Sequence, residues 1–521
     1  MRCRELLQKY GYVIGLVAIT CAIAIGWFLL DGNVGFNLAD EGYLWYGTEA
    51  LLRGEVPMRD FEAYDPGRYV WTAAWSFIVG HGMVPLRLSC VFFGCLGVIA
   101  GLLAVRRVSR NWFFLGAVAL LLSLWMQPRY KAFEQSIALM AVYAGVLLLE
   151  RPSLRRHFAL GVFGGICAFF GRNHGLYHVV AFGLLITYSA WASGFREWIR
   201  RCVTWGSGIF VGYLPQLLMF AFVPRFFRAY LPYVQSTLAK GTTNLTRPVP
   251  WPWLVATDAP VYMRAAGIAE GLFFIAFIVL VFPVAFRLWH LRRRSAPAHL
   301  LLLAAFCVAI PYAHYVFSRA DIVHLSHGVP PMLVGAIALL FTFANSARWV
   351  AWAVIPALTI TSLCAQVSQT GMAFEYLAPD KSLHTVKVND RKIVVSDYQA
   401  RLLASAHYVA DGLARPNEAI FFAPHTPGLY PFVGRRSPTK QIYFVFPATP
   451  EADQSLVSEL QAADVQWALV GDSALDGRDE LRFRNTNPIL CAYLRNNFAV
   501  VPLATLPRHA VLLHRRDTSK S

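Results

Sequence analysis

The sequence predicts an α-helical polytopic membrane bundle followed by a C-terminal extracytoplasmic α/β domain. Hydrophobic residues make up 56% of the 521 positions and the mean hydropathy is +0.46, which is too apolar for an ordinary soluble protein. Apolar runs close to the 20-residue length that spans a bilayer recur up to about residue 370. Beyond that point they shorten to strand length, so a soluble domain follows the bundle.

The membrane part, residues 1–369, contains eleven apolar runs and therefore predicts about eleven spans. The runs are residues 12–30, 85–105, 112–126, 134–150, 158–171, 175–192, 203–222, 263–286, 299–316, 328–344 and 349–366. The first run follows basic residues but is long and lacks a cleavage site before Asp31, so we expect an uncleaved signal anchor. Segment 69–80 is too short to span, and we expect a juxtamembrane helix on the outer interface.

The basic residues indicate the orientation of the chain. The net charge of +17 does not indicate a nucleic-acid partner, because the Lys and Arg residues lie in short clusters between apolar runs. With a cytoplasmic N-terminus, most clusters fall in cytoplasmic connections, as the positive-inside rule requires. The outer face then receives residues 31–84, 127–133, 172–174 and 317–327. We expect a multi-pass protein of the bacterial inner (cytoplasmic) membrane; the Arg-rich, Lys-poor usage fits a GC-rich bacterial genome but does not by itself identify the host.

Residues 370–521 predict a small soluble α/β domain on the periplasmic side. Their 17 Lys and Arg against 15 Asp and Glu are close to neutral. Strand patterns fall at 392–396, 419–423, 466–471 and 510–514, and helical patterns fall at 397–413, 451–463 and 488–496.

The most acidic stretch of the membrane part follows the first span. Residues 31–68 hold eight carboxylates, whereas the other 331 residues before position 370 hold seven. We interpret 31–84 as an outer catalytic loop with juxtamembrane helices, and Asp40-Glu41 as its candidate catalytic pair. A carboxylate there can accept a proton from an attacking hydroxyl. The alternative is that the pair simply opens a helix, because acids favour the first turn.

Basic residues at three other outer connections can bind a phosphate at headgroup depth. They are Arg129 and Lys131, Arg172 and His174, and Arg319 and His324. The alternatives are that the long basic side chains snorkel to lipid headgroups, that Arg319 and Asp321 pair with each other, and that the histidines are interfacial.

Two histidine pairs at helical spacing, His174 with His178 and His324 with His327, raise the question of a metal. Neither pair lies in a zinc-binding pattern. The sequence therefore predicts no metal and no cofactor.

These features, in this order, resemble the GT-C class of polyprenyl-phosphate-sugar glycosyltransferases, in particular the bacterial relatives of protein O-mannosyltransferases and of the lipid A aminoarabinose transferase. The matching residues are Asp40-Glu41 and Tyr43; Leu52, Gly54, Pro57 and Arg59-Asp60-Phe61; Asp65-Pro66-Gly67 and Tyr69; Arg172-Asn173-His174-Gly175; Arg319-Ala320-Asp321 and His324; and Pro427-Gly428-Leu429-Tyr430 with Gly434-Arg435. The match covers essentially the whole chain and is most specific over residues 40–69.

The resemblance implies a bundle of about 11–13 spans and an inverting transfer of a sugar from a polyprenyl phosphate to an acceptor hydroxyl. Asp40 matches the family's catalytic acidic position, with Glu41 beside it as the second candidate. Arg59, Asp60 and Tyr69 belong to the matching motif, and Arg68 takes the phosphate-contacting role. The implied partners are a polyprenyl-phosphate-linked sugar and a lipid, glycan or protein acceptor.

The chain departs from the family pattern after the third span. A second acidic position is often found there, but this chain has Gln127-Pro128-Arg129-Tyr130-Lys131, with Glu134 a turn into the next helix. The acceptor class therefore stays open.

Two other functions compete with a glycosyltransferase of this kind. One is a transporter or flippase of a lipid-linked saccharide, which is disfavoured because the charges gather at one interface and no repeat is visible. The other is a polymerase or ligase of a lipid-linked glycan. A non-catalytic scaffold would leave the acidic loop unexplained.

Overall fold

The computed structural model describes residues 2–240, 244–291, 296–343, 348–367, 383–389 and 391–516. The chain forms two compact units. Unit 1 comprises Met1–Gly32, Arg87–Pro224 and Tyr233–Gly371, and unit 2 comprises Asn33–Leu86, Arg225–Pro232 and Met372–Ser521. Nearly all of the acidic loop, which we had grouped with the membrane part, therefore packs in the same unit as the C-terminal region.

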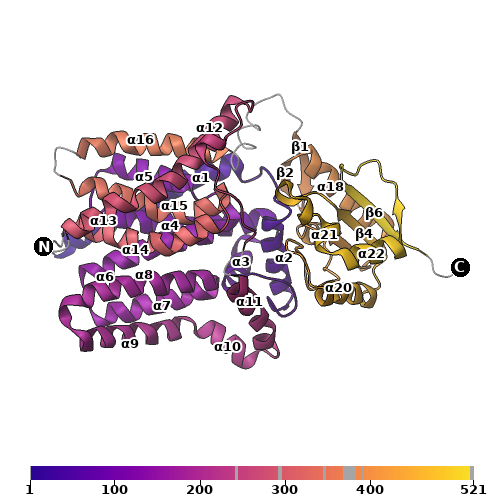
Figure 1. The fold of residues 1–521 in the computed structure, drawn as a ribbon, viewed down its shortest axis with the longest axis horizontal. Coiled ribbons are helices and arrows are strands. Elements are labelled where there is room, and N and C mark those ends of the chain that lie inside the picture. The colour runs from indigo at the N-terminus through magenta and orange to yellow at the C-terminus, as the bar shows by residue number, and fades with distance from the viewer. Residues whose placement is uncertain are drawn as a thin grey trace. The chain divides into compact units, whose positions relative to one another are not determined.

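Unit 1 is a helical bundle in which α6, α7, α8 and α9 run side by side (Figure 1). Its helices are α1 (Arg2–Asp31), α4 (Met83–Val105), α5 (Trp112–Leu124), α6 (Ala132–Glu150), α7 (Leu154–Phe170), α8 (Arg172–Ala190), α9 (Phe195–Gly212), α10 (Leu214–Phe222), α11 (Phe226–Lys240), α12 (Val261–Val279), α13 (Val281–His290), α14 (Pro297–Ser318), α15 (Ile322–Phe341) and α16 (Arg348–Ala365). Helices α4 and α11 begin in unit 2 and continue into unit 1. Short 3₁₀ turns are η1 (Arg129–Lys131), η2 (Trp191–Ser193) and η3 (Pro252–Leu254).

The eleven predicted apolar runs are all helical, but they differ in their capacity to cross a membrane. Among the described residues, six helical segments are long and apolar enough: α1, α4, α6, α12 with α13, α14 and α15. The pair α9 and α10, bent by 54°, makes a seventh if it is one span. Pro215, in the first turn of α10, lies at this bend, where the chain lacks one backbone donor. The remaining helices, α5, α7, α8 and α16, do not meet the same criterion, so their spanning stays a prediction.

Helices α7 and α9 pack backbone against backbone. A Cβ atom on Gly161 would lie 2.0 Å from the carbonyl oxygen of Trp205, and one on Gly212 would lie 2.0 Å from that of Val162. Small residues allow membrane helices to approach this closely, and the contact gains dispersion energy. The glycines on both helices therefore determine how closely α7 and α9 pack.

Unit 2 combines two helices of the acidic loop with an α/β domain. The loop helices are α2 (Asp40–Leu52) and α3 (Pro66–Val79). The domain contains β1 (Leu383–Val388), β2 (Arg391–Ser396), α18 (Asp397–Tyr408), the π-turn η5 (Val409–Leu413), β3 (Ile420–Ala423), α19 (Leu429–Phe432), α20 (Pro450–Ala462), β4 (Trp467–Gly471), the 3₁₀ turns η6 (Leu475–Gly477) and η7 (Asp479–Leu481), α21 (Phe483–Thr486), α22 (Pro488–Asn497), β5 (Phe498–Val501) and β6 (Ala510–Arg515).

The strands form an antiparallel pair β1-β2 and a four-stranded sheet of order β3-β4-β6-β5, in which only β3 and β4 are parallel. The four predicted strands are confirmed. Strands β1 and β5 were missed, because β1 has no regular alternation of buried and exposed residues and β5 follows α22 without turn residues between them.

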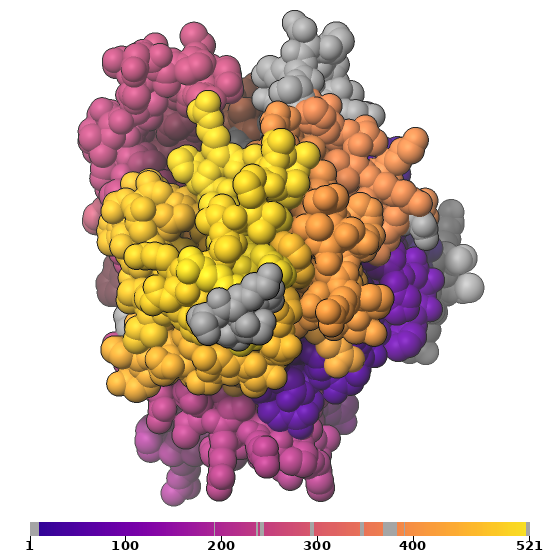
Figure 2. Space-filling model, turned by 90° about the vertical axis from the view of Figure 1, so that its right-hand side faces the viewer, coloured from indigo at the N-terminus to yellow at the C-terminus, as the bar shows by residue number. Residues whose placement is uncertain are grey.

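The acidic loop is joined to the α/β domain by backbone hydrogen bonds. Gly35 donates to the carbonyl of Val394 (2.7 Å), and Gly428 donates to the carbonyl of Leu38 (3.0 Å). The backbone N–H of Glu62 donates to the carbonyl of Lys440 (2.7 Å). These bonds explain why the loop and the C-terminal region form one unit. The C-terminal region forms the orange-to-yellow surface that faces the viewer in Figure 2.

Candidate active site

The two predicted catalytic acids open helix α2. The side-chain oxygen of Asn37 accepts a hydrogen bond from the backbone N–H of Asp40 (2.9 Å), so the helix begins at this residue. The helix-start alternative is therefore correct for the backbone. It is compatible with catalysis because the Asp40 carboxylate is only half-buried, whereas Glu41 is 2% exposed. Of the two acids, Asp40 is better placed to reach a substrate.

Tyr64 links Asp40 to a buried arginine. The Tyr64 hydroxyl donates to Oδ1 of Asp40 (3.4 Å), and the Tyr64 ring lies edge-on to Tyr43 with centroids 4.8 Å apart. The guanidinium of Arg68, which is 5% exposed, lies 4.8 Å from the centroid of the Tyr64 ring. This is within the range of a cation–π interaction. Tyr64 therefore holds a buried positive charge on the ring whose hydroxyl bonds the carboxylate.

Sequence reasoning missed His425 of the α/β domain, whose pKa responds to the charge of Asp40. Its Nε2–H donates to the carbonyl of Phe444 (3.0 Å). Burial lowers the pKa of His425, while the Phe444 hydrogen bond and the charge of Asp40 oppose that shift. Burial thus favours the neutral ring, in which Nε2 carries the proton that Phe444 accepts and Nδ1 is a hydrogen-bond acceptor. The only sequence signal was its place two residues before the matching Pro427-Gly428.

A close glycine contact fixes α2 against the loop that carries His425. A Cβ atom on Gly42 would lie 2.4 Å from the backbone nitrogen of Gly428 and 2.5 Å from its Cα. Position 42 must be glycine for this approach, because real Cβ atoms essentially never lie under 3.0 Å from other atoms; a Cβ on Gly428 would also be tight, at 3.0 Å from the Cα of Gly42. The contact sets the distance between Asp40 and the α/β domain.

The predicted binding residues Arg59, Asp60 and Tyr69 stabilise the loop itself. Arg59 donates two hydrogen bonds to Asp60 (2.8 and 2.7 Å), and this pairing lowers the pKa of Asp60. Tyr69 is fully buried, and its hydroxyl accepts from the backbone N–H of Tyr64 (3.0 Å). These geometries give all three residues structural roles, and their contact with a substrate stays a prediction.

Glu62, in the same loop, is an ionisable group that sequence reasoning did not single out. Its carboxylate accepts from the backbone N–H groups of Ile442 and Tyr443 (both 3.1 Å). Burial nevertheless raises the pKa of Glu62 to about 7, against the effect of these two bonds.

In unit 1, Asp321 organises a second cluster of predicted residues at the turn between α14 and α15. It caps α15 by accepting from the backbone N–H of His324 (3.0 Å), and the same oxygen bonds Nδ1 of His324 (2.7 Å). Nε of Arg319 donates to its other oxygen (2.7 Å). Burial raises the pKa of Asp321, but the hydrogen bonds from His324 and the charge of Arg319 outweigh it and hold this pKa well below its usual range. The alternative that Arg319 and Asp321 pair is therefore confirmed. We name residues 319–324 the Asp321 cluster.

The other basic residues lie at the starts of α6 and α8. Arg129 donates to Asp31, through both the backbone carbonyl (2.7 Å) and the carboxylate (3.0 Å). The half-buried Lys131 ends η1, and the half-buried Arg172 is the first residue of α8. His174 is buried, and its Nδ1 is 2.9 Å from the Tyr312 hydroxyl of α14. His174 thus links α8 to α14, and its contact with a phosphate stays a prediction.

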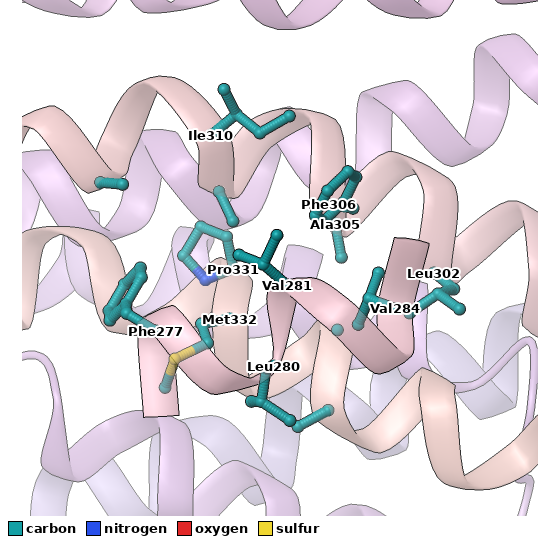
Figure 3. A pocket seen from close by; sticks show the side chains of 14 residues that line it. Phe277, Leu280, Val281, Val284, Leu302, Ala305, Phe306, Ile310, Pro331 and Met332 are labelled. Carbon is teal, nitrogen blue, oxygen red and sulfur yellow. The ribbon is translucent and has the colours of Figure 1, made fainter. Parts of the chain in front are cut away.

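An apolar pocket lies among α12, α13, α14 and α15 in unit 1. Figure 3 shows the rings of Phe277 and Phe306 and the side chains of Val281, Ile310 and Met332 around it. Its lining contains no charged residue. Along α14 the pocket extends to Ala313, six residues before Arg319, which is about 9 Å along a helix.

Among the residues that the structure describes, no group of three or more His, Cys, Asp or Glu side chains could hold a metal ion.

Solved structures similar to this chain give its fold. ArnT from Cupriavidus metallidurans in the apo state matches with a TM-score of 0.54 and 16% identity, covering 97% of this chain and 98% of that chain. The same protein bound to undecaprenyl phosphate matches with a TM-score of 0.53 and 16% identity, covering 98% of each chain. The chain has the GT-C fold. This confirms the predicted fold class and, at the level of fold, the resemblance to GT-C glycosyltransferases. No family model and no curated protein matches the chain in sequence.

Proposed function

We propose that this protein is an inverting glycosyltransferase that moves a sugar from a polyprenyl-phosphate donor to an acceptor hydroxyl. The observation that carries the proposal is the half-buried Asp40 at the start of α2, bonded by Tyr64 and close enough to His425 of the α/β domain for its charge to raise the pKa of that imidazole. The donor class is supported by the GT-C fold and by undecaprenyl phosphate in the similar ArnT structure.

Asp40 acts as the general base. Its carboxylate takes the proton of the acceptor hydroxyl as the acceptor oxygen attacks the anomeric carbon of the sugar. The bond from the anomeric carbon to the phosphate oxygen breaks, and its electron pair stays on the polyprenyl phosphate. Attack from the face opposite the leaving phosphate inverts the anomeric configuration. Asp40 then releases its proton to water.

The guanidinium of Arg68 stabilises the leaving phosphate. Arg68 is held beside the Asp40 region by Tyr64, whose ring it contacts and whose hydroxyl bonds Asp40. Charge-assisted hydrogen bonds to phosphate are roughly twice as strong as neutral ones. Because the negative charge on the phosphate grows as the glycosidic bond breaks, these contacts favour the transition state over the bound donor.

In unit 1, the apolar pocket among α12 to α15 has the kind of lining that an isoprenoid chain requires (Figure 3). An uncharged lining suits a hydrocarbon chain, and the pocket runs along α14 toward the Asp321 cluster. In this proposal the reaction takes place at the outer face of a bacterial inner membrane, with the N-terminus cytoplasmic and residues 383–516 periplasmic. The acceptor hydroxyl belongs to a lipid, a glycan or a protein.

The proposal is tested by reconstituting the purified full chain with lipid-linked sugars extracted from bacterial membranes and a mixed membrane-lipid acceptor fraction. We expect a glycosylated product whose anomeric configuration, measured by NMR, is opposite to that of the donor. A product with retained configuration would contradict the inverting mechanism. Movement of lipid-linked sugar across the membrane of sealed vesicles, without any glycosylated product, would show that the protein is a transporter and not a glycosyltransferase.

A further inference from the structure

The end of unit 1 remote from the Asp321 cluster carries a basic cavity. Helix α6 starts near the cluster, where Gln135 donates to Ser326 of α15 (2.9 Å). The cavity lies at the other end of α6, around Glu150, about 22 Å farther along the helix. It is therefore separate from the Asp321 cluster.

Four arginines converge on this cavity from three segments of the chain. Arg106 and Arg107 follow α4, Arg151 follows α6 and Arg156 belongs to the first turns of α7. Glu150 is the only carboxylate in the described lining, and Arg107 already pairs with it through two hydrogen bonds (2.7 and 3.2 Å). The cavity, of about 620 Å³, therefore carries a net positive charge.

Two of the guanidinium groups are held in place before any ligand binds. Arg106 lies 4.5 Å from the centroid of the Tyr12 ring, which stacks on Trp112 with centroids 4.2 Å apart. The Tyr12 hydroxyl donates to the carbonyl of Arg110 (2.8 Å), and Arg156 donates to the carbonyl of Leu147. Fixed donors lose less entropy on binding than free side chains do.

The remaining lining is apolar. Val13 of α1, Leu103 of α4 and Leu147 of α6 contribute hydrocarbon surface next to the arginines. A ligand that fits this arrangement has an anionic group and a hydrocarbon chain in one molecule.

We propose that this cavity binds the phosphodiester headgroup of an anionic glycerophospholipid, with an acyl chain on the apolar lining. Basic pockets between membrane helices suit such headgroups, and the planar guanidinium matches phosphate oxygens in pairs. The alternative explanation is that these arginines only orient the chain in the membrane. Orientation needs no more than exposed basic residues, such as Arg110 and Arg155 at the same end. It does not explain why four other arginines line one cavity.

The test compares two matched double variants of the full chain in nanodiscs. Arg106→Gln/Arg156→Gln removes two charges from the cavity, and Arg110→Gln/Arg155→Gln removes two exposed charges from the same end. Native mass spectrometry counts the phosphatidylglycerol molecules retained from nanodiscs that contain equal amounts of phosphatidylglycerol and phosphatidylcholine. We expect wild type and the exposed-charge variant to retain one tightly bound phosphatidylglycerol, and the cavity variant to retain it at least tenfold less often.

Equal loss in both double variants, or no preferential retention by wild type, would overturn the proposal. Inorganic phosphate is added to wild type in a parallel arm. If millimolar phosphate displaces the lipid completely, the cavity is a simple anion site and the lipid proposal is wrong. If the cavity double variant does not fold, Arg151→Gln removes one exposed lining charge, and lipid retention must fall for this variant too.

Discussion

Substitution of Gly42 by alanine tests whether the backbone contact between α2 and the α/β domain positions the catalytic base. The new Cβ would lie 2.4 Å from the Gly428 nitrogen, whereas ordinary contact begins at 3.4 Å, so the two segments must separate by 3.4 − 2.4 = 1.0 Å. Both sides of the contact are backbone, so no side chain can rotate away. A misplacement of about 1 Å in an active site costs on the order of 100-fold in rate. We therefore expect Gly42→Ala to lower kcat/KM for sugar transfer by about 100-fold.

Stability is expected to change much less than activity, because alanine favours the helix over glycine by about 1 kcal/mol and offsets part of the steric cost. Transfer is measured with the reconstituted assay, and folding is followed by thermal melting of the same samples. The matched control is Gly183→Ala in α8, where the new Cβ meets no atom within 4 Å. Wild-type activity in Gly42→Ala, or an equal loss in Gly183→Ala, would refute the positioning argument.

Two further predictions concern ionisable groups. The raised pKa of Glu62 means that the folded chain holds a proton between pH 4.5 and about 7 that the unfolded chain has released, so the free energy of unfolding falls as pH rises through this range. We expect Glu62→Gln to remove this pH dependence, measured as the difference between thermal melts at pH 5 and pH 8. The control Glu451→Gln changes an exposed carboxylate and keeps the dependence. The same difference in Glu62→Gln as in wild type would contradict the raised pKa of Glu62. Asp321→Asn keeps a helix-capping side chain but loses the charge that binds Arg319 and His324. We expect this variant to lower the free energy of unfolding by about 2 kcal/mol, measured by denaturant titration. The exposed Asp258→Asn is the control, and equal stability of the two variants would show that the charge does not matter.

The helices and most strands were predictable because each depends on the local pattern of apolar residues. Long apolar runs identified the helices of unit 1, and short ones identified β2, β3, β4 and β6. The number of spans was less predictable, since α8 carries Arg172 and two histidines within a helix of 19 residues. Helix formation depends on the chain alone, whereas crossing a membrane also depends on which side chains face lipid.

The candidate site was predictable only in part. Asp40 was found from the acid concentration and the motif, but its neighbour His425 lies in the other half of the sequence, and no local pattern connects them. The partner of Arg129 was also missed, because Asp31 lies at the end of an apolar helix and belongs to no motif. Pairings of this kind depend on tertiary packing, which a single sequence does not specify.

The role of Asp40 is tested most directly by single-turnover sugar transfer in Asp40→Asn, with donor binding measured on the same sample. Glu49→Gln, on the same helix, is the control, because its amide oxygen can still accept from the Trp45 indole (3.3 Å in wild type). We predict that Asp40→Asn binds the lipid-linked donor with a Kd close to wild type and transfers sugar at least about 100-fold more slowly, the lower limit for loss of a general base. Transfer at the wild-type rate by Asp40→Asn would contradict the account and move the catalytic role away from this residue.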